Sequence, residues 1–206
     1  MVKRAGPIVL AVFLLTGCGA HSIQELKGGE GLKSGGHAAH GPARASGGTA
    51  VPGRDYNPAD VMFLQMMMAH NGQGVRLARL APDRAAREEV RTLAAAIATT
   101  QETEAASMSE RLIGWRRPAT ARADEHAAHG GMPGVGEEEI AAVADAAPAD
   151  FEKKFLNMMI AQQDDAIQLA RMEVATGLNA EVKAMAERVD ASRSAQIKQM
   201  LALLDQ

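Results

Sequence analysis

The stretch FLQMMMAHNGQG, residues 63–74, decides the fold because a close copy, FLNMMIAQQDDA, occurs at residues 155–166. Shifting residues 60–112 by 92 positions aligns the two halves of the chain without a gap, and thirteen of the 53 positions are identical. Most of the identical residues are apolar and follow helical spacing, which indicates an internal duplication. Two similar helical hairpins, each with one apolar stripe, bury those stripes most simply against each other. The duplication therefore predicts an all-α four-helix bundle built from two duplicated helical hairpins.

Capping residues and prolines predict the ends of the helices in the first half. Asn57 is expected to cap a helix that has Pro58 at its first position. This helix should end near Leu80, because Pro82 cannot continue it. A second helix is expected to follow Asp83 and to end near Gly114, a typical C-terminal cap.

The second half has the same signals. One helix should end at Gly177, and Asn179 should cap a last helix that runs to about Leu204. A short helix is expected in EEEIAAVADA, between the halves. The predicted bundle covers residues 57–206, with the first hairpin at 57–115, a linker at 116–148 and the second hairpin at 149–206.

The N-terminus is predicted to direct export. Lys3 and Arg4 precede the apolar run GPIVLAVFLL, which is too short to span a bilayer as a helix. The run ends in LTGC, which resembles the lipobox of bacterial lipoproteins and implies cleavage after residue 17 and lipid on Cys18. An ordinary signal peptide with an incidental cysteine remains the alternative. Residues 18–56 are rich in Gly, Ala, Ser and His and are expected to form a flexible tether to the membrane.

Composition excludes several classes of protein. Aromatic residues make up only 3% of the chain, whereas Ala and Met are abundant, which favours helices over a sheet. Without Lys3 and Arg4, 20 basic residues face 25 acidic ones, and this net charge of −5 gives no support to nucleic-acid binding. With Cys18 as the only cysteine, no intramolecular disulfide is possible.

Residues that could bind a metal ion lie on the inner faces of the first two predicted helices. Met66, Met67 and His70 share one face of the first helix. Antiparallel packing of the hairpin would bring the end of the second helix beside them. A polar and thioether layer could therefore form from Met66, His70, Gln101, Glu104 and Met108. Thioether and imidazole ligands suit Cu(I), whereas a carboxylate would also accept Zn(II) or Cu(II).

The alternative is that these side chains are structural. Methionine often fills irregular gaps in a core, and His70 could be a buried histidine hydrogen-bonded to Glu104 or Gln101, which would need no metal. In the second half, Gln162, Gln163, Arg193 and Gln196 stand where the first half has His70, Asn71, Gln101 and Glu104. If Arg193 faces inward, we expect it to pair with Glu104 across the bundle.

A second histidine pattern lies outside the predicted long helices. The sequence HAAHG occurs at residues 37–41 and again at 126–130. Histidines three positions apart can chelate one ion if the segment forms a turn, so His37 with His40, and His126 with His129, are candidate metal ligands. The alternative is a low-complexity linker with neutral histidines.

Four stretches together resemble a known family: DVMFLQMMMAHNGQGVRLARLA, TQETEAASMSERLIGW, EHAAHGGMPG and FEKKFLNMMIAQQDDAIQLARME. They are similar to the CopM-like family, also called domain of unknown function 305, over about residues 57–204. The resemblance implies a ferritin-like four-helix bundle, often exported or lipid-anchored, and binding of copper or silver in some members. The family has a His-His pair in each half, but here Asn71 replaces the second histidine and Gln162 and Gln163 replace both in the other half.

Two functions remain open from the sequence. The first is a membrane-tethered, extracytoplasmic protein that binds a metal ion, with copper favoured, through methionine and histidine. The second is a scaffold or interaction lipoprotein whose metal site has degenerated. An enzyme is not expected, because the chain has no Glu-x-x-His pair of a di-iron bundle, no phosphate-binding loop and no nucleophile elbow.

Overall fold

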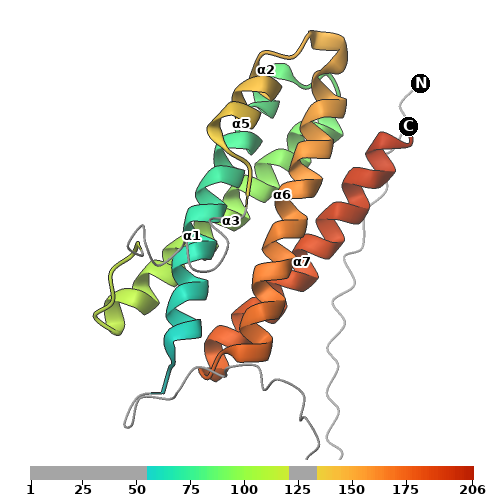
Figure 1. The fold of residues 1–206 in the computed structure, drawn as a ribbon. Coiled ribbons are helices and arrows are strands. Elements are labelled where there is room, and N and C mark those ends of the chain that lie inside the picture. Colours follow the sequence, from blue (N-terminus) through green and yellow to red (C-terminus); the bar gives the residue numbers. More distant parts are fainter. Residues whose placement is uncertain (1–54, 121–133) are drawn as a thin grey trace, which may run out of the picture. The chain divides into compact units, whose positions relative to one another are not determined.

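The computed structural model describes residues 55–120 and 134–206, all of which belong to the compact unit Arg44–Gln206. Its regular elements are all helices (Figure 1). Four are long: α1 (Pro58–Ala78), α3 (Glu88–Gly114), α6 (Pro148–Thr176) and α7 (Ala180–Leu204). Two are short: α2 (Ala81–Arg84) and α5 (Glu137–Ala144). The predicted all-helical fold is confirmed, whereas the predicted signal peptide, Cys18 and nearly all of the predicted tether lie outside the described residues.

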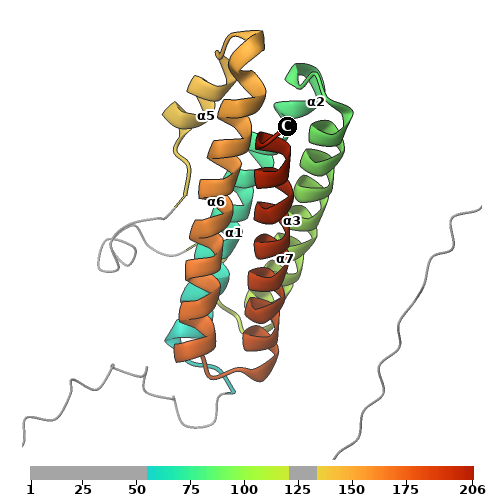
Figure 2. The same cartoon turned by 90° about the vertical axis from the view of Figure 1, so that its right-hand side faces the viewer.

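The four long helices lie side by side as a bundle (Figures 1 and 2). α1 and α7 run in one direction, and α3 and α6 run in the other. α1 packs against α3 and α6, and α6 packs against α7, so each sequence hairpin is also a hairpin in space. α3 and α6 run in the same direction, so the chain between them must return along the bundle, as in bundles with a crossover connection. α5 covers part of α6.

Local sequence explains most helix ends. Asn57 and Asp60 form a reciprocal capping box at the start of α1, and the side chain of Asn179 caps α7, as expected. The expected start of the second helix at Asp83 was wrong. Pro82 lies in the first turn of α2, where it costs no hydrogen bond, and α3 begins only after Arg87. Gly114 is the last residue of α3, so the C-cap is Trp115.

In each hairpin, one carboxylate on the first helix accepts hydrogen bonds from the backbone just before the second helix of the other hairpin. Asp60 of α1 accepts hydrogen bonds from the backbone N–H groups of Leu178 and Asn179, at 3.1 and 2.9 Å, in the turn before α7. Glu152 of α6 accepts the backbone N–H of Arg87, at 2.6 Å, just before α3. Asp60 and Glu152 are 92 positions apart, as are Arg87 and Asn179, so the duplication has kept this contact in both directions.

The core forms two apolar clusters. One contains Leu77, Ile97, Phe151, Met159 and Met200, and the other contains Phe63, Met67, Met108, Leu169 and Val189, among other buried residues. Counterpart residues, meaning those 92 positions apart, fall into opposite clusters: Met67 and Met159, and Met108 and Met200. The two hairpins are therefore related by an approximate two-fold rotation that exchanges the clusters.

Replacing Asp60 with Ala should reduce the free energy of unfolding by about 2–4 kcal/mol, because several buried backbone N–H groups lose a charged acceptor. The Asp60 side chain is fully buried, whereas the Glu152 side chain is 17% exposed, so Glu152→Ala should cost less. Urea unfolding followed by circular dichroism measures both. Glu110→Ala, on the exposed face of α3, is the control and should stay within about 0.5 kcal/mol of the parent. Equal losses in all three variants would contradict the assigned role of Asp60.

Candidate functional site

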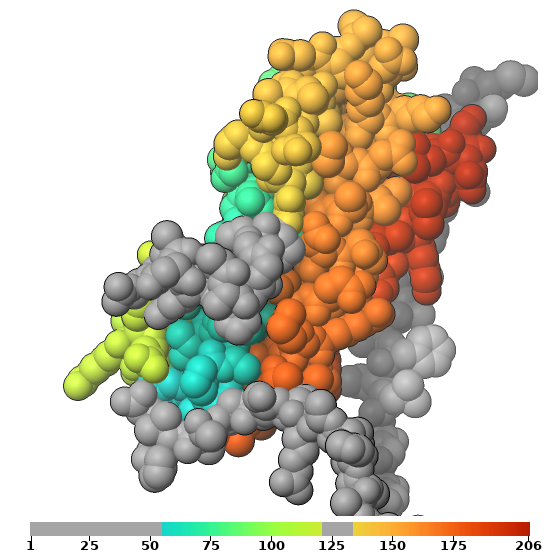
Figure 3. Space-filling model, viewed as in Figure 1, coloured from blue at the N-terminus to red at the C-terminus, as the bar shows by residue number. Residues whose placement is uncertain are grey.

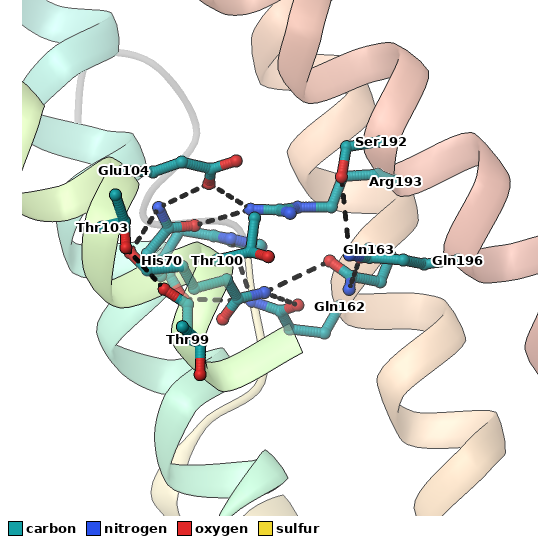
Figure 4. A network of polar contacts seen from close by, with 12 residues as sticks. His70, Thr99, Thr100, Thr103, Glu104, Gln162, Gln163, Ser192, Arg193 and Gln196 are labelled. Atoms are coloured by element: carbon teal, nitrogen blue, oxygen red, sulfur yellow. Dashed lines mark hydrogen bonds and ion pairs between the residues drawn. The ribbon is translucent and has the colours of Figure 1, made fainter. Parts of the chain in front are cut away.

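A layer of polar side chains crosses the core between the two apolar clusters (Figure 4). Each long helix supplies two members, and we call the set the polar layer: His70, Asn71, Gln101, Glu104, Gln162, Gln163, Arg193 and Gln196. Six of the eight are fully buried, the exceptions being Glu104 and Gln196. Buried polar groups destabilise a core unless they are hydrogen-bonded, so the contacts within this layer decide how well the helices fit.

The hydrogen bonds of the polar layer follow the duplication. Within the first hairpin, Asn71 Nδ2 donates to Glu104 Oε2 at 3.1 Å, and in the second Gln163 Nε2 donates to Gln196 Oε1 at 2.6 Å. These two bonds join counterpart residues. The layer is thus an inherited feature of both halves.

Two contacts between the hairpins also join counterpart residues. Gln101 Nε2 of α3 donates to Gln163 Oε1 of α6 at 3.3 Å. Its counterpart, Arg193 of α7, donates through Nη2 to Asn71 Oδ1 of α1 at 3.4 Å. Both contacts cross from the second helix of one hairpin to the first helix of the other. They therefore fix how the two hairpins are aligned along the bundle.

His70 and its counterpart Gln162 meet where the two hairpins face each other. The Gln162 amide nitrogen donates to the His70 carbonyl oxygen and lies 3.0 Å from His70 Nδ1. Since that amide nitrogen carries only donors, Nδ1 is the acceptor, and the ring proton resides on Nε2. Nε2 is buried and has no hydrogen-bond partner among the described residues. Burial and the charge of Arg193 lower the pKa of His70 from 6.5 to about 4, so the ring is neutral at pH 7.

Arg193 faces inward and forms an ion pair with Glu104, as the sequence predicted. The Arg193 side chain is fully buried, and the Glu104 side chain is 18% exposed. Burial lowers the pKa of Arg193, and the negative charge of Glu104 opposes that shift. Nε and Nη1 of Arg193 have no partner among the described residues. The layer therefore holds a cation of its own, which repels a metal ion.

The predicted polar and thioether layer is divided in the structure. His70, Gln101 and Glu104 lie in the polar layer. Met66, Met67 and Met108 lie in the neighbouring apolar cluster, with Met67 and Met108 fully buried. The candidate ligands His37, His40, His126 and His129 lie outside the described residues. Within residues 55–120 and 134–206, no group of three or more His, Cys, Asp or Glu side chains could hold a metal ion.

As it stands, the polar layer fits a metal ion poorly. Ligation through Nε2 of His70 requires the other tautomer, in which Nδ1 carries the proton. That proton would point at the donor nitrogen of Gln162, so the Gln162 amide would have to turn and give up its bond to the His70 carbonyl oxygen. A metal ion at His70 therefore needs a rearrangement of Gln162.

Gly74 is a part of the site that the sequence analysis missed. A Cβ atom at this position would overlap the Gln101 side-chain amide and lie 2.5 Å from Gln162 Nε2. The absence of a side chain on α1 thus lets α3 and α6 bring their glutamines together beside His70. The signal in the sequence was a glycine on the buried face of a helix, one turn after the histidine, where glycine is otherwise unfavourable.

The model for the family named Domain of unknown function (DUF305) matches residues 60–204. The chain belongs to the DUF305 family. Both duplicated hairpins lie within the match, so the approximate two-fold arrangement is part of the family domain. No curated protein matches the chain.

Solved structures of DUF305 proteins have the same fold. A DUF305 fragment from Deinococcus radiodurans has a TM-score of 0.65 and 25% identity, and the match covers 74% of this chain and 99% of that one. A DUF305 protein from Streptomyces coelicolor, whose name describes it as secreted, has a TM-score of 0.66 and 28% identity, over 71% of this chain and 92% of that one. CopM in its Cu(I)-bound form has a TM-score of 0.60 and 26% identity, over 71% of this chain and 95% of CopM. CopM is also known in Cu(II)-bound and Ag-bound forms.

Gly74→Ala should destabilise this DUF305 domain by about 1–3 kcal/mol, because the added Cβ would push apart the glutamines of the polar layer. Gly72→Ala is the matched control in the same helix. Its Cβ would meet only the end of the Arg76 side chain, at 3.9 Å, so it should stabilise α1 by about 0.5–1 kcal/mol. Thermal unfolding measures both, and a similar effect of the two substitutions would contradict the proposed role of Gly74.

The stability of the domain should fall as the pH drops from 6.5 towards 4, because unfolded chains bind a proton at His70 that the folded state excludes. A pKa lowered from 6.5 to about 4 corresponds to a loss on the order of 3 kcal/mol below both values. His70→Gln, which copies the counterpart residue Gln162, should flatten the pH dependence in this window. Urea unfolding of both proteins at pH 7, 5.5 and 4.5 tests this. Parallel curves would show that His70 is not the responsible group.

Proposed function

We propose that the protein binds a soft metal ion, copper or silver, on the extracytoplasmic side of a membrane to which lipid on Cys18 tethers it. The observation that carries the proposal is the likeness to CopM, a structure known with Cu(I), Cu(II) and Ag bound. The proposal names methionine and histidine as ligands, because thioethers and neutral imidazole suit such ions. His70 supplies a neutral ring at pH 7. Met66 and Met67 supply thioethers one helical turn before it in α1, and Met108 supplies a third from the same apolar cluster, in α3.

Export rests on the N-terminal sequence and on the name of the relative from Streptomyces coelicolor. Of the helices that the structure describes, none has both the length and the apolar character needed to cross a membrane. The proposed attachment therefore depends on the acyl chains at Cys18. We also propose a role that is not enzymatic.

A second candidate is a scaffold or interaction lipoprotein that has lost its metal site. Arg193 favours the scaffold, because its buried guanidinium lies in the polar layer and forms an ion pair with Glu104. This candidate requires that no version of the chain bind a soft metal ion. Its own test is recovery of the same protein partner in repeated pulldowns from detergent-solubilised envelope.

The two candidates differ in an anaerobic Cu(I) titration against a competing chelator, made on residues 19–206. We expect the chain to bind Cu(I), and His70→Ala to weaken binding about tenfold if the imidazole is a ligand. Arg193→Gln, which copies Gln101, should strengthen binding at the polar layer because it removes a buried positive charge. Arg188→Gln, on the exposed surface of α7, removes the same charge away from the layer and should change nothing.

A version lacking residues 37–40 and 126–129 separates the bundle from the histidine pairs. Binding lost only in this version would assign the metal to the HAAH segments and leave the methionines as core residues. No binding of Cu(I) or Ag(I) above background in any version would contradict the proposal and favour the scaffold.

A further inference from the structure

One end of the bundle has features that the polar layer and the proposed metal binding do not use. At this end α1 begins, α3 ends and α6 turns into α7, as Figures 1 and 2 show. Figure 3 shows the start of α1 in cyan between the end of α3 in yellow-green and the end of α6 in orange. The predicted tether leads into α1 here. We therefore call residues 55–60, 110–120 and 172–183 the tether end.

Side-chain contacts join the parts of the tether end. Asn57, before α1, donates from Nδ2 to the backbone oxygen of Thr176 at the end of α6, at 2.9 Å. Arg111, in the last turn of α3, forms an ion pair with Glu181 in the first turn of α7. The ends of all four long helices therefore form one connected surface.

Large apolar side chains are exposed on this surface. In the described part of the chain, four large apolar side chains are exposed, and three of them belong to the tether end: Ile113 at 69%, Leu178 at 46% and Met172 at 43%. The fourth, Leu201, lies near the end of α7 at the opposite end of the bundle. Exposed apolar side chains that gather in one region indicate contact with a partner or a membrane.

The only tryptophan and the only tyrosine of the chain lie at the tether end. The rings of Tyr56 and Trp115 are stacked, with their centroids 4.0 Å apart. The guanidinium of Arg111 lies 5.8 Å from the centroid of Trp115, and that of Arg117 lies 6.0 Å from the centroid of Tyr56. Tryptophan and tyrosine are enriched where a membrane meets water, because each has an apolar ring and a polar group.

Arg116 occupies a backbone position that favours glycine. Its φ is 55°, in the left-handed region, and it directly follows the C-cap Trp115. The N–H groups of Arg116 and Arg117 donate to the carbonyl oxygens of Ile113 and Leu112, at 2.9 and 2.8 Å, which is the hydrogen-bond pattern of a Schellman motif. Glycine is the usual residue at this position, because a side chain there is strained. An arginine kept at such a position indicates a role beyond ending the helix.

The two ends of the bundle differ in charge. Among side chains that reach the surface, the tether end has four basic and three acidic residues. The opposite end, residues 80–91, 137–154 and 198–206, has six basic and ten acidic residues. Arg116 and Arg117 form no ion pair with any residue that the structure describes. A negatively charged surface would therefore attract the tether end and repel the opposite end.

We propose that the tether end rests on an anionic phospholipid surface, with its three exposed apolar side chains among the headgroups and Arg116 and Arg117 against the phosphate groups. The inference rests on the proposed function for the lipid on Cys18, which brings the domain to the membrane. A few apolar and basic side chains bind a membrane weakly alone, so the anchor and this surface act together, as two membrane signals do. The acidic end then points away from the membrane.

The test uses the single tryptophan as a probe of contact with lipid. The protein is purified from the membranes of the cells that produce it. It is then placed, without added metal ions, in phosphatidylcholine vesicles with about a quarter phosphatidylglycerol. Some acyl chains carry bromine, which quenches tryptophan fluorescence only at close range. We expect bromine to quench Trp115. Trp115→Phe with Leu201→Trp moves the probe to the opposite end and should give several-fold less quenching.

The arginines are tested against a matched control. Arg116→Gly with Arg117→Gln should lower quenching about twofold to fivefold in the anionic vesicles and leave it unchanged in phosphatidylcholine alone. Lys198→Gln, which removes the same charge at the opposite end, should have no effect. Arg116→Gly alone should raise Tm by about 2–4 °C while it lowers quenching. A purely structural role of Arg116 would instead lower Tm.

The exposed apolar side chains are tested in the same way. Ile113→Ser with Leu178→Ser should lower quenching in both kinds of vesicle, because the loss is apolar. Leu201→Ser is the control at the opposite end and should change nothing. Circular dichroism checks that each variant is folded.

The outcomes separate this surface from the proposed anchor. Equal quenching of the probes at the two ends would overturn the inference. No quenching of Trp115 would also overturn it and leave a protein partner as the occupant of the tether end. Mass spectrometry of the same sample shows whether Cys18 carries lipid. Its absence would contradict the anchor, whereas quenching of protein added to preformed vesicles would still support contact between the tether end and lipid.

Discussion

The polar layer is the constraint on which the rest of the structure depends. All four long helices must bring polar side chains to the same level, because a misplaced Gln or Asn would leave buried groups unpaired. Apolar side chains above and below the layer tolerate sliding, since Met and Leu adapt to irregular gaps. The hydrogen bonds of the polar layer do not tolerate sliding of the helices, and they therefore fix the helices relative to one another. The reciprocal contacts of Asp60 and Glu152 hold the same arrangement at the two ends of the bundle.

Comparison of the two duplicated halves shows where counterpart residues make the same contacts and where they differ. Two pairs of hydrogen bonds in the polar layer join counterpart residues, and one of them persists although Arg193 stands where the first half has Gln101. Arg193 brings a buried positive charge to the second half, and Glu104 lies across from it as an ion-pair partner. The ends of the bundle have diverged further. Glu173 and Gly177 lie together at one end, where the counterparts are Ala81 and Ala85, and Arg84 and Phe151 form a cation–π contact at the other.

The polar layer and the cavity between α1 and α6 differ in physical character. The polar layer has a neutral imidazole but also a guanidinium, and the His70 nitrogen that could bind a metal is protonated while Gln162 keeps its present hydrogen bonds. The cavity between α1 and α6 is lined by Met62, Met66 and Met172, and beside it burial, the hydrogen bond with Asp60 and the charge of Asp60 raise the pKa of Glu173 to about 9. The methionines of the MMMAH stretch divide accordingly: Met67 packs in the core, and Met66 reaches the cavity.

The sequence by itself determined the helical class, the duplication, the caps at Asn57 and Asn179, and the pairing of Arg193 with Glu104. These depend on local spacing and on counterpart positions, which are readable along the chain. The start of α3 was mispredicted, because the short α2 places Pro82 in a first turn where proline is tolerated. Only the tertiary structure decided that Met66 and Met108 lie outside the polar layer, that Gln162 holds the tautomer of His70, and that Met172 and Glu173 join Met62. Those contacts join residues far apart in sequence. They depend on the rotation of each helix about its own axis, and helical periodicity alone does not determine that rotation.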